Sequence, residues 1–145
     1  MDTQIKPLSR FAEAQANGVY EQALAEIRAG RKQSHWIWFI FPQIEGLGYS
    51  STAQFYGVQG LQEARDYLAD AVLGTRLREI CAALLELESS DPLEVLGSPD
   101  DLKLCSSMTL FAFAAPDDPL FAAVLKKFYN GERCGLTERK LLRDR

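Results

Sequence analysis

The sequence predicts an all-α fold, a compact single domain over residues 1–145 with an array of about six to eight helices. Three observations favour this fold. Apolar residues recur at the spacing of one helix face along most of the chain, and Ser or Asp followed by Pro marks several helix starts. A composition of 47% hydrophobic and 25% charged residues is typical of a globular protein with a substantial core.

The first half of the chain carries four expected helices around one ambiguous segment. Ser9 caps the first, Gly30 ends the second, and Ser50 or Ser51 begins a third that runs toward Tyr56. A fourth ends near Gly74. Their apolar stripes are formed by Phe11 and Ala12, by Tyr20, Ala23, Leu24 and Ile27, and by Leu61, Ala64 and Leu68.

The second half predicts helices with clearer boundaries. The longest apolar stripe runs over residues 73–87, and a short turn of helix lies between Asp91-Pro92 and Gly97. Ser98-Pro99-Asp100-Asp101 is the best start, because a serine cap, a proline at the first position and an acid at the third agree. The remaining expected boundaries are Pro116, Asp118-Pro119, Gly131 and Thr137.

Six large apolar side chains stand in a row from Trp36 to Phe41. A helix fits because Ser34 is placed to cap it and Pro42 ends it. A strand fits the residue preferences, but its one candidate partner is residues 108–113. We expect a short helix buried at the centre of the array, with a strand as the alternative. Truncation of Phe39 to alanine would then cost about 3–5 kcal/mol.

A faint internal repeat links the two ends of the chain. Phe11, Ala12 and Ala14 match Phe111, Ala112 and Ala114, and the stripe that begins at Tyr20 matches the one that begins at Phe121. The match is consistent with a duplicated helix pair. Amphipathic helices also resemble one another by chance, so both explanations stay open.

Charge and cysteine content exclude several classes of protein. A net charge of −4 argues against duplex nucleic acid as a partner. The N-terminus shows no signal peptide, and no run approaches the ~20 apolar residues of a membrane span. Three cysteines and one histidine form no metal-binding pattern. We therefore expect a cytoplasmic monomer without membrane contact, disulfide, metal or cofactor.

The segment from Lys32 to Gly48 is the candidate binding site. Arg31 and Lys32 stand just before Ser34, and a helix start there would offer free N–H groups to a phosphate. His35 would lie in the first turn, where the helix field disfavours its protonated form, and it is the candidate catalytic base. A solvated basic turn beside a core histidine is the structural alternative.

Aromatic, amide and glycine residues complete this segment. Trp36 or Trp38 would stack a planar ring, and Gln43 would hydrogen-bond its polar edge. Gly46 and Gly48 form a loop that enters the next helix, although it lacks the lysine of a phosphate-binding loop. Core packing of the tryptophans and a plain tight turn are the alternatives.

A polar face interrupts the apolar helix expected after Ser98. Lys103, Ser106 and Ser107 lie three and four residues apart and so share one face. They either line a pocket or form the solvated side of the helix. Asp101 is better explained by its capping position than as a catalytic acid.

The blocks RFAEAQ, EIRAGRKQSHWIWFIFPQIEGLG, EARDYLADAVLGTRL and DDLKLCSSMTLF together resemble a bacterial family known as domain of unknown function 1810, sometimes labelled calpastatin-like. The most specific block is K-x-S-H-W-x-W-F-x-F-P-Q, from Lys32 to Gln43. The resemblance implies a mostly α-helical domain without an established activity. This chain departs from the family at Asp70-Ala71, where His-Pro is frequent, and at Cys134, where aspartate is frequent.

Three functions fit these residues. The first is a binding module for a small anionic or nucleotide-like ligand, with a phosphate-bearing molecule as the partner. The second is a hydrolase of an ADP-ribose- or NAD-type substrate, suggested by a looser likeness to bacterial helical domains that process NAD and ADP-ribose. The third is a protein–protein interaction module. No acid–base pair identifies a reaction, so binding is preferred and enzyme activity stays open.

Overall fold

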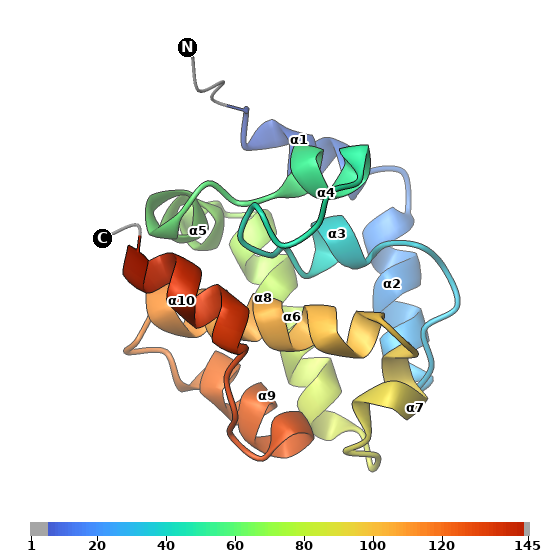
Figure 1. Ribbon diagram of the computed structural model, residues 1–145. Helices are drawn as coiled ribbons and strands as arrows, with labels where there is room; N and C mark the ends of the chain where they lie inside the picture. The colour runs from blue at the N-terminus through green and yellow to red at the C-terminus, as the bar shows by residue number, and fades with distance from the viewer. Residues whose placement is uncertain (1–5, 144–145) are drawn as a thin grey trace.

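The computed structural model describes residues 6–143, and over these residues the chain is all-α, as predicted (Figure 1). The described residues form ten helices, more than predicted, because several are only one or two turns long. They are α1 Ser9–Ala14, α2 Val19–Arg28, α3 Ile37–Ile40, α4 Ser51–Tyr56, α5 Leu61–Ala69, α6 Leu73–Glu86, α7 Pro92–Leu96, α8 Asp100–Ala114, α9 Pro119–Tyr129 and α10 Gly135–Arg143. Among these helices, none is long and apolar enough to cross a membrane.

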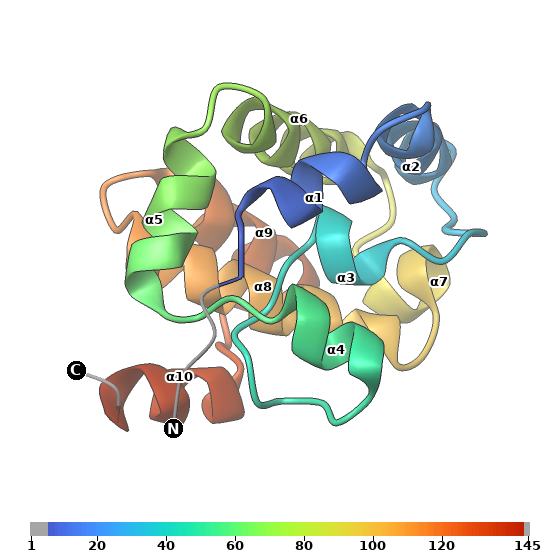
Figure 2. The same ribbon diagram turned by 90° about the horizontal axis from the view of Figure 1, so that it is seen from above.

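Helix α8 lies at the centre of the molecule in both ribbon views (Figure 1, Figure 2). It packs against α5, α7, α9 and α10 and also contacts α3. Its residues from Ser106 to Phe111 are all buried, which is typical of a helix that other helices surround. Helix α6 packs against α2, α5 and α9 and completes the core behind α8.

The short helix in the aromatic segment is shallower than predicted. Helix α3 covers only Ile37–Ile40, and Trp38 and Phe39 are partly exposed. The prediction that the whole run is buried at the centre is therefore wrong, because α8 occupies that place. The strand alternative is also wrong, since the only extended pairing within residues 6–143 is an isolated parallel bridge between Ile44 and Val58.

Glu26 explains why Ser34 does not cap α3. Its carboxylate accepts hydrogen bonds from the Ser34 hydroxyl at 2.6 Å, from the Gln33 and Ser34 N–H groups, and from the Trp36 indole at 2.8 Å. Partial burial would raise the pKa of Glu26, but these donors outweigh it and lower the pKa to about 2. The turn before α3 is thus built around a partly buried carboxylate from α2.

Three of the predicted helix caps are confirmed. Ser50, Asp91 and Asp118 accept hydrogen bonds from N–H groups in the first turns of α4, α7 and α9. The cap expected at Ser98 is wrong, because the Gly97 carbonyl accepts the Asp101 N–H at 2.9 Å and Pro99 occupies the N-cap position. Helix α10 also begins earlier than predicted, two residues before Thr137.

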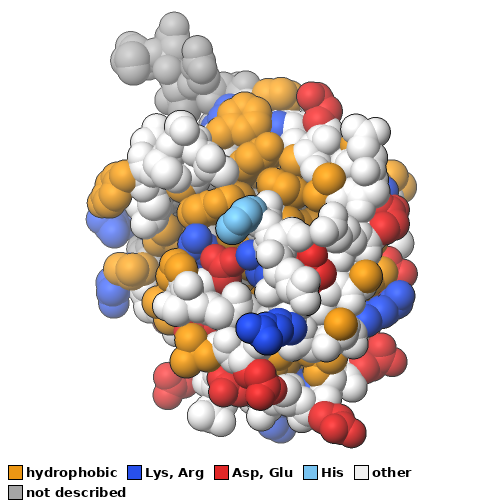
Figure 3. Space-filling model, turned by 90° about the vertical axis from the view of Figure 1, so that its right-hand side faces the viewer, with side chains coloured by type: hydrophobic (Ala, Val, Ile, Leu, Met, Phe, Trp, Pro, Cys, Tyr) orange, Lys and Arg blue, Asp and Glu red, His pale blue; other side chains and the backbone are white. Residues whose placement is uncertain are grey.

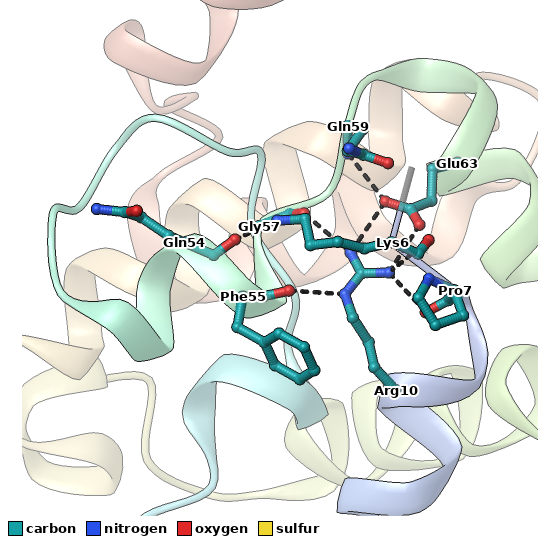
Figure 4. Close-up of polar contacts among 8 residues, drawn as sticks. All are labelled: Lys6, Pro7, Arg10, Gln54, Phe55, Gly57, Gln59 and Glu63. Carbon is teal, nitrogen blue, oxygen red and sulfur yellow. Dashed lines mark hydrogen bonds and ion pairs between the residues drawn. The ribbon is translucent and has the colours of Figure 1, made fainter. Parts of the chain in front are cut away.

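A buried arginine joins three distant segments, as Figure 4 shows. Arg10 in α1 forms an ion pair with Glu63 in α5, with nitrogen–oxygen distances of 2.9 and 3.1 Å. Its donors also reach the carbonyl groups of Lys6, Pro7, Phe55 and Gly57. The guanidinium is buried, and six hydrogen bonds, two of them to Glu63, compensate for the loss of water.

The internal repeat stays a hypothesis. Both α2 and α9 pack against α6, and both Phe11 and Phe111 are fully buried, as a duplicated helix pair would require. Helix α1, however, has 6 residues where α8 has 15. Only α2 and α9, the second helices of the two proposed pairs, are similar in length.

Candidate functional site

A cleft of about 730 Å³ lies beside α8, between the segment after α3 and the loop from α9 to α10. Its volume is within the range of small-molecule pockets. The residues that line it are Trp38, Gln43, Leu47, Gly48, Pro99, Leu102, Lys103, Cys105, Ser106, Tyr129, Asn130, Glu132, Arg133, Cys134, Gly135, Leu136 and Arg139. Three stretches that are far apart in the sequence therefore build one concave surface.

A smaller cavity of about 380 Å³ adjoins this cleft and shares Trp38, Pro99 and Lys103 with it. The rest of its lining includes Lys32, His35 and Asp100. Figure 3 shows the face that carries the single histidine, with basic and acidic side chains beside it. His35 itself is exposed.

Charged side chains at the boundary of the two cavities form a network. The Asp100 carboxylate lies 2.8 Å from Lys32 Nζ and 3.3 Å from Lys103 Nζ. Each ammonium also lies over an indole, Lys32 over Trp36 at 5.1 Å and Lys103 over Trp38 at 3.9 Å from the ring centre. Each lysine is therefore held both by Asp100 and by the face of an indole.

Gln43 presents a buried polar group to the cleft. Pro42 ends the α3 segment, and the Gln43 carbonyl accepts the Val58 N–H at 2.8 Å, which fixes the backbone. Gln43 is 8% exposed, and its side-chain Nε2 has no hydrogen-bond partner among residues 6–143. Burial of an amide donor without an acceptor costs free energy, so this atom is a candidate ligand contact.

Cys134 occupies the N-cap position of α10, where its carbonyl accepts the Glu138 N–H at 3.0 Å. Its own N–H donates to the Thr109 hydroxyl at 2.9 Å, and the Ser106 hydroxyl lies 3.2 Å from its sulfur. Partial burial would raise the pKa of this thiol, but the Ser106 hydroxyl and the polar groups of Leu136 and Thr137 at the start of α10 outweigh burial and lower the pKa below the ordinary value.

Positive charge gathers at the cleft although the whole chain is acidic. Lys103, Arg133 and Arg139 line it against a single carboxylate, that of Glu132. Arg133 pairs with Glu138 at 3.2 Å, and Arg139 lies one turn into α10, close to Gly135. The N-terminal end of α10, with its partial positive charge, lies in the same region.

Residues 5–141 match the sequence profile of a family described as protein of unknown function, DUF1810. The chain belongs to the DUF1810 family. It is 47% identical to the conserved hypothetical protein Rv1873 from Mycobacterium tuberculosis, whose crystal structure it matches with a TM-score of 0.90 over 93% of this chain and 96% of that one. None of the curated proteins matches the chain.

In this DUF1810 chain the structure brings together only part of the predicted site. Five of the predicted residues line the cleft: Trp38, Gln43, Gly48, Lys103 and Ser106. Lys32 and His35 line the adjoining cavity. Arg31 faces a separate surface cavity of about 750 Å³ between the end of α2 and α7, which Lys32 also borders.

The remaining predicted site residues of the DUF1810 chain do not line the cleft and have structural roles instead. The Ser34 hydroxyl is bonded to Glu26, and Trp36 is buried in the core. Gly46 lies beside the Lys140 side chain with φ at +91°, a conformation that favours glycine. Ser107 is fully buried within α8 and does not line the cleft.

Sequence reasoning missed the contribution of the loop from α9 to α10. Arg133, Cys134 and Arg139 line the cleft because Thr109 and Ser106 of α8 hold Cys134 against the central helix. The motif Gly131-Glu-Arg-Cys-Gly135 indicates an exposed thiol in a loop. It contains no signal that the loop folds back onto α8, nearly 30 residues earlier in the chain.

Proposed function

We propose that this DUF1810 chain binds a small anionic ligand in the cleft beside α8. The observation that carries the proposal is the buried Gln43 amide, a donor without an acceptor among the described residues, in a cleft that three cationic side chains line. A ligand oxygen would satisfy Gln43 Nε2, and the anionic group would lie near Lys103 and Arg139.

Apolar surface around the cleft supports a ligand with a flat or apolar body. Leu102 is 65% exposed and Leu136 is 60% exposed, and both line the cleft together with Trp38 and Tyr129. Contact with a ligand would remove this apolar surface from water. A phosphate-bearing molecule with a planar ring therefore fits the lining better than inorganic phosphate alone.

The two alternative functions have weaker support. A hydrolase of ADP-ribose- or NAD-type substrates was predicted to use His35 as its base, but His35 is exposed and lies in the adjoining cavity rather than in the cleft. A protein–protein interaction module would use the exposed leucines, but these border a concave pocket with a buried polar floor. Both stay predictions.

The test is thermal unfolding in the presence of pyrophosphate, ADP, ADP-ribose and NAD. A ligand at 100 times its Kd stabilises the fold by about 2.7 kcal/mol, which raises Tm by several degrees. Arg139→Ala and Lys103→Ala should reduce this shift. The matched controls are Arg143→Ala, in the last turn of the same helix, and Lys126→Ala, on the exposed face of α9; both should retain it.

The proposal fails if none of these anions shifts Tm. It also fails if a shift occurs and the cleft variants and the control variants retain it equally.

A further inference from the structure

We propose that the cleft and the adjoining cavity together bind one ligand that carries two separate anionic groups, one in each cavity. The inference deepens the proposed function and rests on it, because the first anionic group is the one assigned to the cleft. Three observations support it: the excess of cationic side chains in the adjoining cavity, the burial of Lys32, and the boundary that the two cavities share.

The adjoining cavity holds more positive charge than its carboxylate can neutralise. Lys32, Lys103 and His35 line it, and Asp100 is the only acidic residue among the described residues of its lining. Each oxygen of that carboxylate already has one ammonium group, Oδ2 that of Lys32 at 2.8 Å and Oδ1 that of Lys103 at 3.3 Å. Two lysines on one carboxylate leave a positive charge in the lining without a counter-ion, even when His35 is neutral.

Burial strengthens the effect of that excess charge. The side chain of Lys32 is 8% exposed and that of Asp100 is 15% exposed, so water screens these charges poorly. The Lys32 backbone N–H donates to the Val95 carbonyl at 2.7 Å, and the ammonium lies over the Trp36 ring, which hold the residue in this place. An anion in the adjoining cavity would therefore interact with Lys32 more strongly than with a lysine surrounded by water.

The two cavities meet where a single ligand can cross from one to the other. Trp38, Pro99 and Lys103 line both of them. Pro99 is exposed and Trp38 is partly exposed, so the boundary lies at the surface rather than in the core. The adjoining cavity has about 380 Å³, which is room for a phosphate or carboxylate group and part of the body that carries it.

This arrangement favours one class of ligand. A molecule with a single anionic group fills the cleft and leaves the excess charge beside Lys32 unpaired. A molecule with a second phosphate or carboxylate, joined to the first by a ring or sugar that spans Trp38, neutralises both cavities. Since both groups belong to one molecule, the second contact needs no further loss of translational freedom.

The experiment compares AMP with ATP and with adenosine 3′,5′-bisphosphate by isothermal titration calorimetry of the full chain at constant ionic strength. ATP extends the anionic charge from the 5′ side of the sugar and the bisphosphate extends it from the 3′ side, so the pair covers both orientations of the nucleoside. One of the two should bind about 10-fold more tightly than AMP, or better, because hydrogen bonds between charged groups are worth that factor.

Variants of the adjoining cavity test where this gain comes from. Lys32→Ala should remove most of the gain and weaken AMP binding much less. His35→Ala changes an exposed residue, which keeps the fold intact, and should reduce the gain as well. The matched control is Arg28→Ala, which also removes one positive charge but lines neither the cleft nor the adjoining cavity, and it should retain the gain. If Lys32→Ala does not fold, as judged by circular dichroism, His35→Ala decides on the same terms.

The outcomes separate this inference from the proposed function. The inference is overturned if neither larger ligand binds more tightly than AMP, or if the gain survives Lys32→Ala; AMP binding that depends on Arg139 then leaves the proposed function standing. Binding that depends on Lys32 but is unchanged in Arg139→Ala and Gln43→Ala would place the whole anion in the adjoining cavity and refute both. If none of the three nucleotides binds, the inference is wrong, and the four anions of the thermal unfolding test decide the proposed function.

Discussion

The ammonium group of Lys103 lies 3.9 Å from the centre of the Trp38 ring, at the boundary between the cleft and the adjoining cavity. Asp100 holds the same ammonium from the other cavity at 3.3 Å. An anion in the cleft would compete with Asp100 for Lys103. We therefore expect the position of this lysine over the indole to change when an anion occupies the cleft.

Tryptophan fluorescence should detect that movement. Binding of an anion changes the position of the Lys103 ammonium over Trp38, and the emission of Trp38 should change with it. Trp36 is buried and bonded to Glu26, so its emission should stay constant. In a titration with ADP, Trp36→Phe should keep the signal and Trp38→Phe should lose it. The opposite result would place the ligand outside the cleft.

The two phenylalanines of the aromatic segment should differ in their effect on stability. Phe41 is fully buried, and its ring centre lies 6.0 Å from that of Trp36, whereas Phe39 is partly exposed. Phe41→Ala should lower the free energy of unfolding by about 3–5 kcal/mol, and Phe39→Ala by clearly less. Urea unfolding of the two variants gives the comparison. Equal losses would contradict the shallow position of α3.

Glu26 should make stability depend on pH in the acid range. The pKa of its carboxyl is about 2 in the fold, against an ordinary value of 4.5. Because the folded pKa is the lower one, the carboxylate stabilises the fold above pH 4.5, and this contribution is lost as the pH falls toward 2. Glu26→Gln should cost about 2 kcal/mol at pH 7 and little near pH 2.

The matched control for that measurement is Glu13→Gln, an exposed glutamate on α1. Its stability should follow that of the unaltered chain at every pH. A loss for Glu26→Gln that is the same at pH 7 and near pH 2 would show that the charge is not the stabilising feature.

Removal of Arg10 should be among the more damaging substitutions. Arg10→Ala leaves Glu63 without its cation and removes a donor from four carbonyl groups. Loss of one partner of a buried ion pair costs about 3–5 kcal/mol. Urea unfolding should show this loss, whereas Arg28→Ala, an exposed arginine of α2, should change stability by less than about 0.5 kcal/mol.

Local sequence signals predicted a helix start correctly where the capping side chain itself bonds the first turn. The caps at Asp91 and Asp118 work because aspartate followed by proline satisfies an N–H of the first turn without help from distant residues. Ser98 has the same kind of signal, yet a backbone bond from Asp101 to Gly97 closes the turn instead. A side chain and a nearby backbone carbonyl can compete for the same N–H group, and the sequence does not show which of them accepts it.

Only part of the candidate site could be predicted from the sequence, again because contacts between distant residues leave no local signal. Residues on one helix face can be grouped from their spacing, which is why Lys103 and Ser106 were found together. The depth of Ser107 and the approach of Cys134 depend on which helix is central and where a loop folds back. Likewise, the buried pair of Arg10 and Glu63 joins positions 53 residues apart, a pairing that no local pattern contains.

Arg10 also sets a limit on when the chain can fold during synthesis. Its partners Phe55, Gly57 and Glu63 follow it by 45, 47 and 53 residues, so its charge stays hydrated until Glu63 has left the ribosome. Phe11, the next residue, packs against Tyr56 and Tyr67, so its burial also waits for residues made much later. The N-terminal helix therefore completes its packing only after the middle of the protein exists, and a nascent chain stopped before residue 63 carries an unprotected apolar segment for chaperones to bind.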